Sequence, residues 1–532
     1  MKHIFLKLSF LCASTFFVNV ADAVSLFVEK WGNNNAECSR TEPCNEIATA
    51  LAIATTNDRI IVGPGTYSGD LQILQDGIRL ESTGGPRVTI IDGLSSPGIT
   101  AIDVQADRVS IGRAGGRGFT IKSLNADAIN AGSGDEIIGC EPDPQLVDGE
   151  LVAVPILSGP NLVSRLRIEG NKIIHLSNDA PSIQNVRCEL VFGGLGVFTP
   201  QLVEEPVLSN AIDVLGDGII LTGNNIFGQS FIVVDLSNTF TRSTIRDNNI
   251  KHSFVNLNSL PDFPTFGGEP LYSSLSIFGD NSSISNNQFE SLGLESSSLV
   301  DTNGEDLASP SGVLLFSQRS STFSNNIVRG FSLGIAAFSP QIVSRNIILD
   351  PISIGVFEGG GSNILDNTVT STQPFSILGI AAINSRLIRG NNVSGFNRST
   401  GLLLIQEDTG NFLNRSFTSV SNNNLYDSGG LSRCSVFVAH EENSFGQPIA
   451  ILPVRMSRNF FGSAAEQPLI IESSNNDTDG LPSAPTNSET WNICAQDGLV
   501  NLVSGEPEIE EVTTNPVLRA NRVRALLRIN PF

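Results

Sequence analysis

Two short polar segments, each following an apolar run of strand length, hold the side chains best suited to chemistry. They are Gln406, Glu407 and Asp408, and His440, Glu441 and Glu442. If the apolar runs 401–405 and 435–439 are neighbouring parallel strands, the two polar segments lie side by side, about 5 Å apart. The pairs are then Gln406 with His440, Glu407 with Glu441, and Asp408 with Glu442.

This acidic corner suits two kinds of chemistry. Glu407 and Glu441, with His440 beside them, could act as general acid and as nucleophile or base on a glycosidic bond, because carboxyl separations of about 5 to 9 Å serve that reaction. Alternatively, Asp408 and Glu442 together with Glu407 and Glu441 could bind Ca²⁺, which prefers oxygen ligands. The plainer interpretation is that strand ends meet solvent and are therefore polar.

Other polar and aromatic residues are candidate ligand contacts. Asn384 and Arg386 fall at the levels of Gln406 and Asp408 in the preceding coil, and an insertion carries three aromatic residues, Phe263, Phe266 and Tyr272. Three further titratable residues are expected to be structural. His175 and His252 should be surface or corner residues, and the chain should bend outward after Phe357, because burying the carboxylate of Glu358 is costly.

The elements that position these residues come from a repeat. An apolar residue, two of any type, Asn, one of any type and a second apolar residue recur ten times. Steps of 20, 21 and 24 residues separate Asn326, Asn346, Asn367 and Asn391, and a Gly-led apolar run falls within each step. The ten asparagines are Asn171, Asn224, Asn248, Asn287, Asn326, Asn346, Asn367, Asn391, Asn423 and Asn459.

Such a period predicts stacked coils of parallel strands, since short strands bury their apolar faces only when coils stack. A β-sandwich is the alternative, but its strands keep no motif at fixed spacing. Asn at this position suits a sharp corner, where it tolerates left-handed backbone angles and can bond the Asn of the next coil. We therefore predict an all-β right-handed parallel β-helix with a short N-terminal capping helix and a C-terminal tail.

The start of the chain resembles the entrance of a known superfamily. Residues 43–54 have apolar side chains at helical spacing, and residues 58–67 read as a strand that ends in Pro64-Gly-Thr-Tyr67. With the Asn repeat, this resembles right-handed parallel β-helix proteins of the pectin-lyase-like superfamily. The resemblance implies the fold but no single activity. The catalytic signatures of polygalacturonases and mannuronan epimerases are missing.

The spacing of the repeat also outlines the domains. Insertions at the same corner of adjacent coils are expected to form two ridges that flank a groove, one from 259–274 with 293–311 and the other from 406–417 with 440–453. We predict a signal peptide at 1–23, an N-terminal cap at 24–56, the β-helix at 57–462, and a polar linker with a C-terminal cap or tail at 463–532. Insertions are expected at about 139–210, 259–274, 293–311, 406–417 and 440–453.

Composition indicates where the protein is located and which partners it can bind. Basic, apolar and small residues follow one another in 1–23 as in a signal peptide, which predicts a secreted, extracellular or cell-surface protein, with the periplasm as the alternative. No later segment is long and apolar enough to be expected to span a bilayer. A net charge of -22 argues against nucleic acid as a partner.

Six of the seven cysteines follow the signal segment, and an even number outside the cytosol predicts disulfides. Six cysteines allow fifteen pairings. The sequential one is expected, namely Cys38–Cys44, Cys140–Cys188 and Cys434–Cys494.

The sequence thus leaves two functions open. One is glycan or other surface-ligand binding along the ridged face without catalysis. The other is polysaccharide cleavage, by a lyase or hydrolase, at the acidic corner. Neither requires a cofactor, although Ca²⁺ could be bound.

Overall fold

The computed structural model describes most of the chain between residues 23 and 511. The stretches outside the described residues are 1–22, 35–36, 134–136, 141–144, 148–149, 153–154, 158–160, 178–182, 193–197, 208, 231, 237–241, 254–272, 293–310, 317–320, 339–340, 374–375, 377, 397–399, 407–417, 427–433, 441–453, 458, 462–469, 473–490, 497–499, 503–509 and 512–532.

Each turn of the chain contributes one strand to each of three long parallel sheets. A representative coil runs through β31 (Ser321–Ser324), β32 (Ile327–Arg329) and β33 (Leu333–Phe338) before β34 (Gln341–Ser344) stacks on β31. Apolar residues at the same level of successive coils face inward, and Phe323, Val343 and Ile364 are fully buried. Stacking therefore makes one continuous core from strands that are too short to form a core alone.

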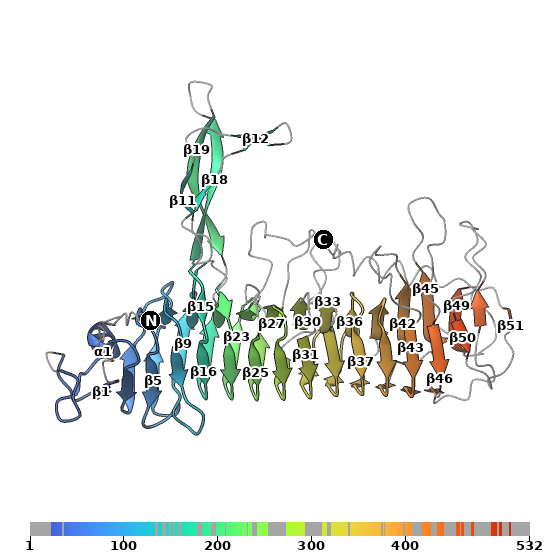
Figure 1. Ribbon diagram of the computed structural model, residues 1–532, viewed down its shortest axis with the longest axis horizontal. Coiled ribbons are helices and arrows are strands. Elements are labelled where there is room, and N and C mark those ends of the chain that lie inside the picture. The colour runs from blue at the N-terminus through green and yellow to red at the C-terminus, as the bar shows by residue number, and fades with distance from the viewer. Residues whose placement is uncertain are drawn as a thin grey trace, which may run out of the picture.

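The three sheets are named here A, B and C. Within the described residues, sheet A has 15 strands, from β1 (Ser25–Val28) to β50 (Val500–Leu502), and sheet C has 15, from β4 (Leu71–Ile73) to β51 (Glu510–Glu511). Sheet B has 13 strands, beginning at β3 (Gly65–Ser68). Figure 1 shows the sheets running side by side along one straight rod. The predicted fold class is confirmed, and sheets A and C continue beyond residue 462.

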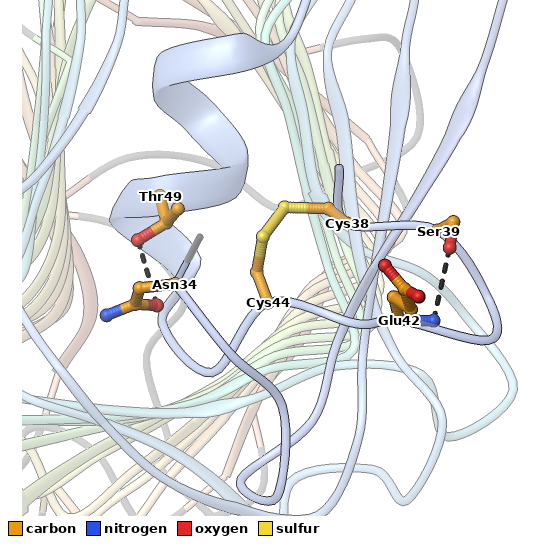
Figure 2. Close-up of a disulfide and its surroundings, with 6 residues drawn as sticks. All are labelled: Asn34, Cys38, Ser39, Glu42, Cys44 and Thr49. Atoms are coloured by element: carbon orange, nitrogen blue, oxygen red, sulfur yellow. Dashed lines mark hydrogen bonds between the residues drawn. A yellow bond between two sulfur atoms is a disulfide. The ribbon is translucent and has the colours of Figure 1, made fainter. Parts of the chain in front are cut away.

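A short helix closes the N-terminal end of the rod, as the spacing of apolar residues predicts. Helix α1 (Ile47–Ile53) buries Ile47 and Ala50 and packs against β1, β4 and β2 (Arg59–Val62). A disulfide between Cys38 and Cys44 closes the loop that precedes the helix (Figure 2). This pairing was predicted.

The other predicted disulfides lie in strands whose side chains the structure does not describe. In the described backbone, Cys434 pairs with Trp491 and Cys494 pairs with Phe437. The two cysteines are then three residues apart along neighbouring strands, about 10 Å, whereas a disulfide needs Cα atoms within about 7 Å. This register does not favour Cys434–Cys494, and Cys140–Cys188 stays a prediction.

The repeated asparagines form a continuous buried ladder. The side-chain amide of Asn346 donates to the side-chain oxygen of Asn367 at 2.9 Å, and the same pattern links all ten residues from Asn171 to Asn459. The predicted hydrogen bond to the Asn of the next coil is confirmed. The left-handed backbone angles, however, belong to the residue before the Asn and not to the Asn itself. The residue before each of the nine ladder asparagines from Asn171 to Asn423 has positive φ, as at Arg345 (55°) and Gly223 (66°). This leaves the Asn side chain free to point into the rod.

An arm projects from the rod near its N-terminal third (Figure 1). It is built from β18 (Ile183–Phe192) paired antiparallel with β19 (Phe198–Val207), and β11 (Ile137–Cys140), itself paired with β14 (Pro155–Leu157), packs against both. These strands occupy the predicted insertion at about 139–210. The other four predicted insertions lie almost wholly outside the described residues, so the two ridges stay predictions, as does the signal peptide.

Candidate functional site

The predicted acidic corner is only partly within the described residues. Strand β42 (Thr400–Gln406) pairs with β45 (Cys434–His440), and this register sets Gln406 opposite His440 as expected. Arg386 is exposed, whereas Asn384 is buried at 3% exposure in a left-handed turn. The other predicted site residues lie outside the described part, and their roles stay predictions: Glu407, Asp408, Glu441, Glu442, Phe263, Phe266 and Tyr272.

The expectation for Glu358 is wrong. Strand β36 (Ile354–Glu358) does not bend outward, and the Glu358 side chain is fully buried. The backbone amides of Gly360 and Ser362 donate to its carboxylate at 2.6 and 2.7 Å, and the Ser385 hydroxyl donates to its other oxygen. Burial raises the pKa of Glu358, and these hydrogen bonds oppose the shift. The glycine-rich turn thus provides donors for the carboxylate instead of turning it outward.

The expectation for the two histidines is also wrong, because both are fully buried. His175 lies in β17 (Lys172–Leu176), and its Nδ1 and Nε2 lie 3.0 and 3.3 Å from the hydroxyls of Ser123 and Ser209. His252 lies in β26 (Asn249–Ser253), with Nε2 2.7 Å from the carbonyl of Ser230. Burial lowers the pKa of each imidazole to about 4, so both are neutral at pH 7. Serine hydroxyls suit this role because they can donate or accept.

A group of carboxylates that the sequence analysis did not single out lies on the outer face of sheet C. Asp103, Asn130, Asp213 and Asp235 occupy one level of four consecutive strands. These strands are β7 (Ile102–Val104), β10 (Ile129–Ala131), β20 (Ile212–Val214) and β24 (Ile232–Leu236). All four side chains are half-buried, whereas their apolar neighbours along each strand point into the core.

Asp127, just before β10, completes what we call the carboxyl cluster: Asp103, Asp127, Asp213 and Asp235. The backbone amide of Asn210 donates to Asp127 at 2.6 Å, and the Asn210 side chain donates to Asp213 at 3.4 Å. The side chains of Asn130 and Gln105 donate to Asp103 at 3.0 and 2.9 Å. Amide donors therefore connect carboxylates of neighbouring coils.

Burial and neighbouring negative charges disfavour ionisation within the carboxyl cluster. Burial raises the pKa of Asp127 to about 7, with the charges of Asp235 and Asp103 adding to the shift and the Asn210 hydrogen bond opposing it. Burial and the charges of Asp127 and Asp235 also raise the pKa of Asp213 well above its ordinary value. With a pKa of about 7, Asp127 is partly protonated at neutral pH, so the cluster retains a proton that it can share or donate.

The cluster lies where the arm joins the rod. The segment that contains β11 and β14 leaves the rod after β10, and the segment that contains β18 and β19 returns to it before β20. The two strands in the middle of the row therefore carry both insertions. A rigid sheet face beside a projecting element is a common setting for a binding site.

Sequence reasoning missed the cluster because the insertions separate residues that meet there, such as Asp127 and its partner Asn210, which are 83 residues apart. A signal was nevertheless present. Three of the strands contain an Asp between two apolar residues, in Ile102-Asp-Val104, Ile212-Asp-Val214 and Val234-Asp-Leu236. This shared pattern could have aligned the coils across the insertions.

Farther along sheet C, the outer face becomes aromatic. Phe278, Phe316 and Phe338 stack with ring centroids 4.2 and 4.6 Å apart and planes within 18° and 5° of parallel. Rings stacked in this way use their faces on one another, which leaves mainly edges for a ligand. The stack is therefore better suited to stabilising the rod than to binding sugar rings.

Two further properties of the described residues concern metals and membranes. The described residues include no group of three or more His, Cys, Asp or Glu side chains arranged to hold a metal ion. They also include no helix with the length and apolar character needed to cross a membrane.

Comparison with known proteins bears on the fold. No family model matches the chain, and no curated protein matches its sequence. Among solved structures, a mannuronic acid specific polysaccharide family 6 lyase from human gut microbiota is similar over 95% of both chains, with 10% identity and a TM-score of 0.34. The A-module of a mannuronan C-5 epimerase from Azotobacter vinelandii is similar over 88% of this chain and 93% of its own, with 11% identity and a TM-score of 0.31.

The Dettilon tailspike protein is similar over 84% of this chain, with 12% identity and a TM-score of 0.32, and this chain spans 63% of the tailspike. At these identities and TM-scores, no activity transfers to this chain. The stacked sheets A, B and C form a right-handed parallel β-helix, which is the fold that the resemblance to the pectin-lyase-like superfamily implies.

Proposed function

We propose that this protein binds a neutral polysaccharide across the outer face of sheet C, with the carboxyl cluster at the centre of the site. The observation that carries the proposal is the row of half-buried Asp and Asn side chains on four consecutive strands at the foot of the arm. Carboxylate and amide groups can bond the hydroxyls of an extended glycan. A net charge of -22 and the cluster itself disfavour anionic sugars.

Binding to neutral and acidic polysaccharides would test the proposal. We expect measurable affinity for a neutral glucan, mannan or xylan, and weaker affinity for pectate or alginate. Asp213→Asn should weaken the neutral interaction up to about tenfold, because the amide cannot share the proton of the cluster as the carboxyl does, and one hydrogen bond to a sugar hydroxyl contributes about 0.5 to 1.5 kcal/mol. Asp247→Asn is the matched control, since Asp247 is exposed at the turn after β25 (Thr244–Arg246), in sheet A. Equal binding by both variants would contradict the proposal.

Hydrolysis of a glycosidic bond is a second candidate for the same site. The raised pKa of Asp127, about 7, and of Asp213 favours it, because a carboxyl that holds a proton near neutral pH can serve as general acid. Asp213 and Asp235 lie on neighbouring strands, about 4.8 Å apart in the backbone. Retaining glycosidases place their two carboxyls about 5 to 5.5 Å apart. This arrangement would let Asp213 protonate the leaving oxygen and Asp235 attack.

Reducing-end release separates the two candidates. If the protein is a hydrolase, wild-type protein releases reducing ends from the polysaccharide that it binds, and Asp235→Asn stops release while binding persists. Binding without release by the wild type would leave only the first candidate. The acidic corner predicted from the sequence is tested in parallel by Glu407→Gln and Glu441→Gln, which should leave both readouts unchanged if the carboxyl cluster is the site.

A further inference from the structure

The buried His175 belongs to sheet B, and it contacts the segment that leads into β20 of sheet C, one of the strands that carry the carboxyl cluster. Its ring is fully buried in the rod interior, between Ser123 of the preceding coil and Ser209, which enters the next strand of sheet C. The main-chain groups of Ala126 and Ser209 also lie beside the ring, and their effect opposes the lowering of the His175 pKa by burial. One imidazole therefore contacts two chain segments that are far apart in sequence.

In each of these segments, the next residue is one partner of the hydrogen bond between Asn210 and Asp127. Ala126 precedes Asp127, and Ser209 precedes Asn210. Asn210 in turn donates its backbone amide to Asp127 at 2.6 Å and its side-chain amide to Asp213 at 3.4 Å. The contacts of His175 thus hold the main chain on both sides of the closest hydrogen bond in the cluster.

We propose that His175 is a positioning residue for the carboxyl cluster, holding Asp127 and Asn210 together from inside the rod. The inference rests on the proposed function only in treating the cluster as the ligand site. His175 itself touches no ligand, because its ring has no exposed surface. It acts through the backbone, by fixing where the two strand entries begin.

The structure also offers a matched control. His252 is equally buried in the same sheet, two coils farther along, with Gly228 between the two histidines in register. Among its hydrogen bonds are those to the carbonyl of Ser230 and the hydroxyl of Ser274, and neither residue is next in sequence to Asp127 or Asn210. Loss of either ring leaves a similar cavity, but only His175 lies behind Asp127.

The test compares three variants by the titration of Asp127. His175→Asn can keep a polar atom near Ser123 but not one near Ser209, whereas His175→Gln can reach toward Ser209. The third variant is His252→Asn. Titration is followed by the carboxyl ¹³C signal of Asp-labelled full-length protein, with the Asp127 signal assigned by its absence in Asp127→Asn. Exchange of the Asn210 amide, measured by hydrogen–deuterium exchange, reports the same contact independently.

We expect His175→Asn to move the Asp127 titration from about 7 toward its ordinary value by about one pH unit, as water enters and the neighbouring carboxylates move apart. Exchange at Asn210 should rise about tenfold or more. His175→Gln should restore part of both effects, and His252→Asn should cause neither. Equal shifts in His175→Asn and His252→Asn, or no shift in either, would overturn the proposal.

The outcome is independent of the proposed function, because neither readout needs a glycan. If His175→Asn moves the titration while Asp213→Asn leaves polysaccharide binding intact, the positioning role stands and the proposed binding site is wrong. If the reverse result is obtained, the binding site stands and His175 is a packing residue.

Discussion

Replacing Asn346 by Ala tests whether the Asn ladder holds neighbouring coils together. The Asn346 side chain is fully buried. Its oxygen accepts hydrogen bonds from the backbone and side-chain amides of Asn326 at 3.0 and 3.1 Å. Its amide donates to the carbonyl of Phe323 at 3.0 Å and to Asn367 at 2.9 Å. Alanine removes all four bonds and leaves the Asn326 backbone amide and the Phe323 carbonyl without these partners.

The expected cost follows from these two backbone groups. Each buried polar group left without a partner costs about 1 to 3 kcal/mol. The side-chain amide of Asn326 adds no such cost, because it still donates to two carbonyls at 3.0 Å. We therefore expect the local free energy of unfolding to fall by about 2 to 5 kcal/mol. Because a solenoid can open coil by coil, the quantity to measure is hydrogen exchange in residues 321–350, not one global midpoint.

The control is Asn392→Ala, which removes an Asn–Asn bond on the exposed face of sheet B. Asn424 donates to Asn392 at 3.0 Å, but both side chains reach solvent. Substitutions of this kind usually change stability by less than about 0.5 kcal/mol. Equal protection of residues 321–350 in wild type and Asn346→Ala would refute the idea that the buried ladder couples the coils.

Three other predictions follow from single features. Gly223→Ala should cost about 1 to 2 kcal/mol, measured by urea unfolding, because φ is 66° while no atom lies within 4 Å of the added Cβ; no loss would contradict this. The pKa of His252 is about 4 when folded and about 6.5 when unfolded, so stability around β26 should fall by about 3 kcal/mol as pH drops from 6.5 to 4. Exchange near β26 should show this fall, and His252→Gln should flatten it. Reducing Cys38–Cys44 should destabilise the N-terminal cap by about 2 kcal/mol, and faster proteolysis near α1 than in the oxidised protein would confirm it.

The fold could be predicted because the repeat sets both the coil length and the inward face. Asn326, Asn346 and Asn367 keep nearly constant spacing, and each is the first buried side chain after a corner. The prediction placed positive φ at the Asn itself, because it assigned tolerance of positive φ and hydrogen-bonding capacity to the same residue. In the structure they are divided between two residues, such as Arg345 and Asn346.

The candidate site could not be predicted in the same way, because its members belong to coils interrupted by long insertions. Without a fixed step, the sequence does not show that Asn130 and Asp213 are neighbours, although the sheet pairs them directly. The predictions for the buried titratable groups were wrong for another reason. A cost of burial was correctly assigned to Glu358, but its donors come from the turn that follows and from Ser385 one coil farther on.

The contrast between interior and exterior polar groups explains why the carboxyl cluster is the better candidate site. Inside the rod, Glu358 accepts two backbone hydrogen bonds of 2.6 and 2.7 Å as well as a serine hydroxyl, so its hydrogen-bonding needs are met by the fold. On the outer face of sheet C, Asp213 accepts from Asn210 at 3.4 Å among the described residues, beside other carboxylates. A carboxyl that is half-buried, weakly bonded and crowded by like charge gains most from new donors. Hydroxyl groups of a bound glycan would supply such donors, and this is why Asp213→Asn is the variant most informative about binding.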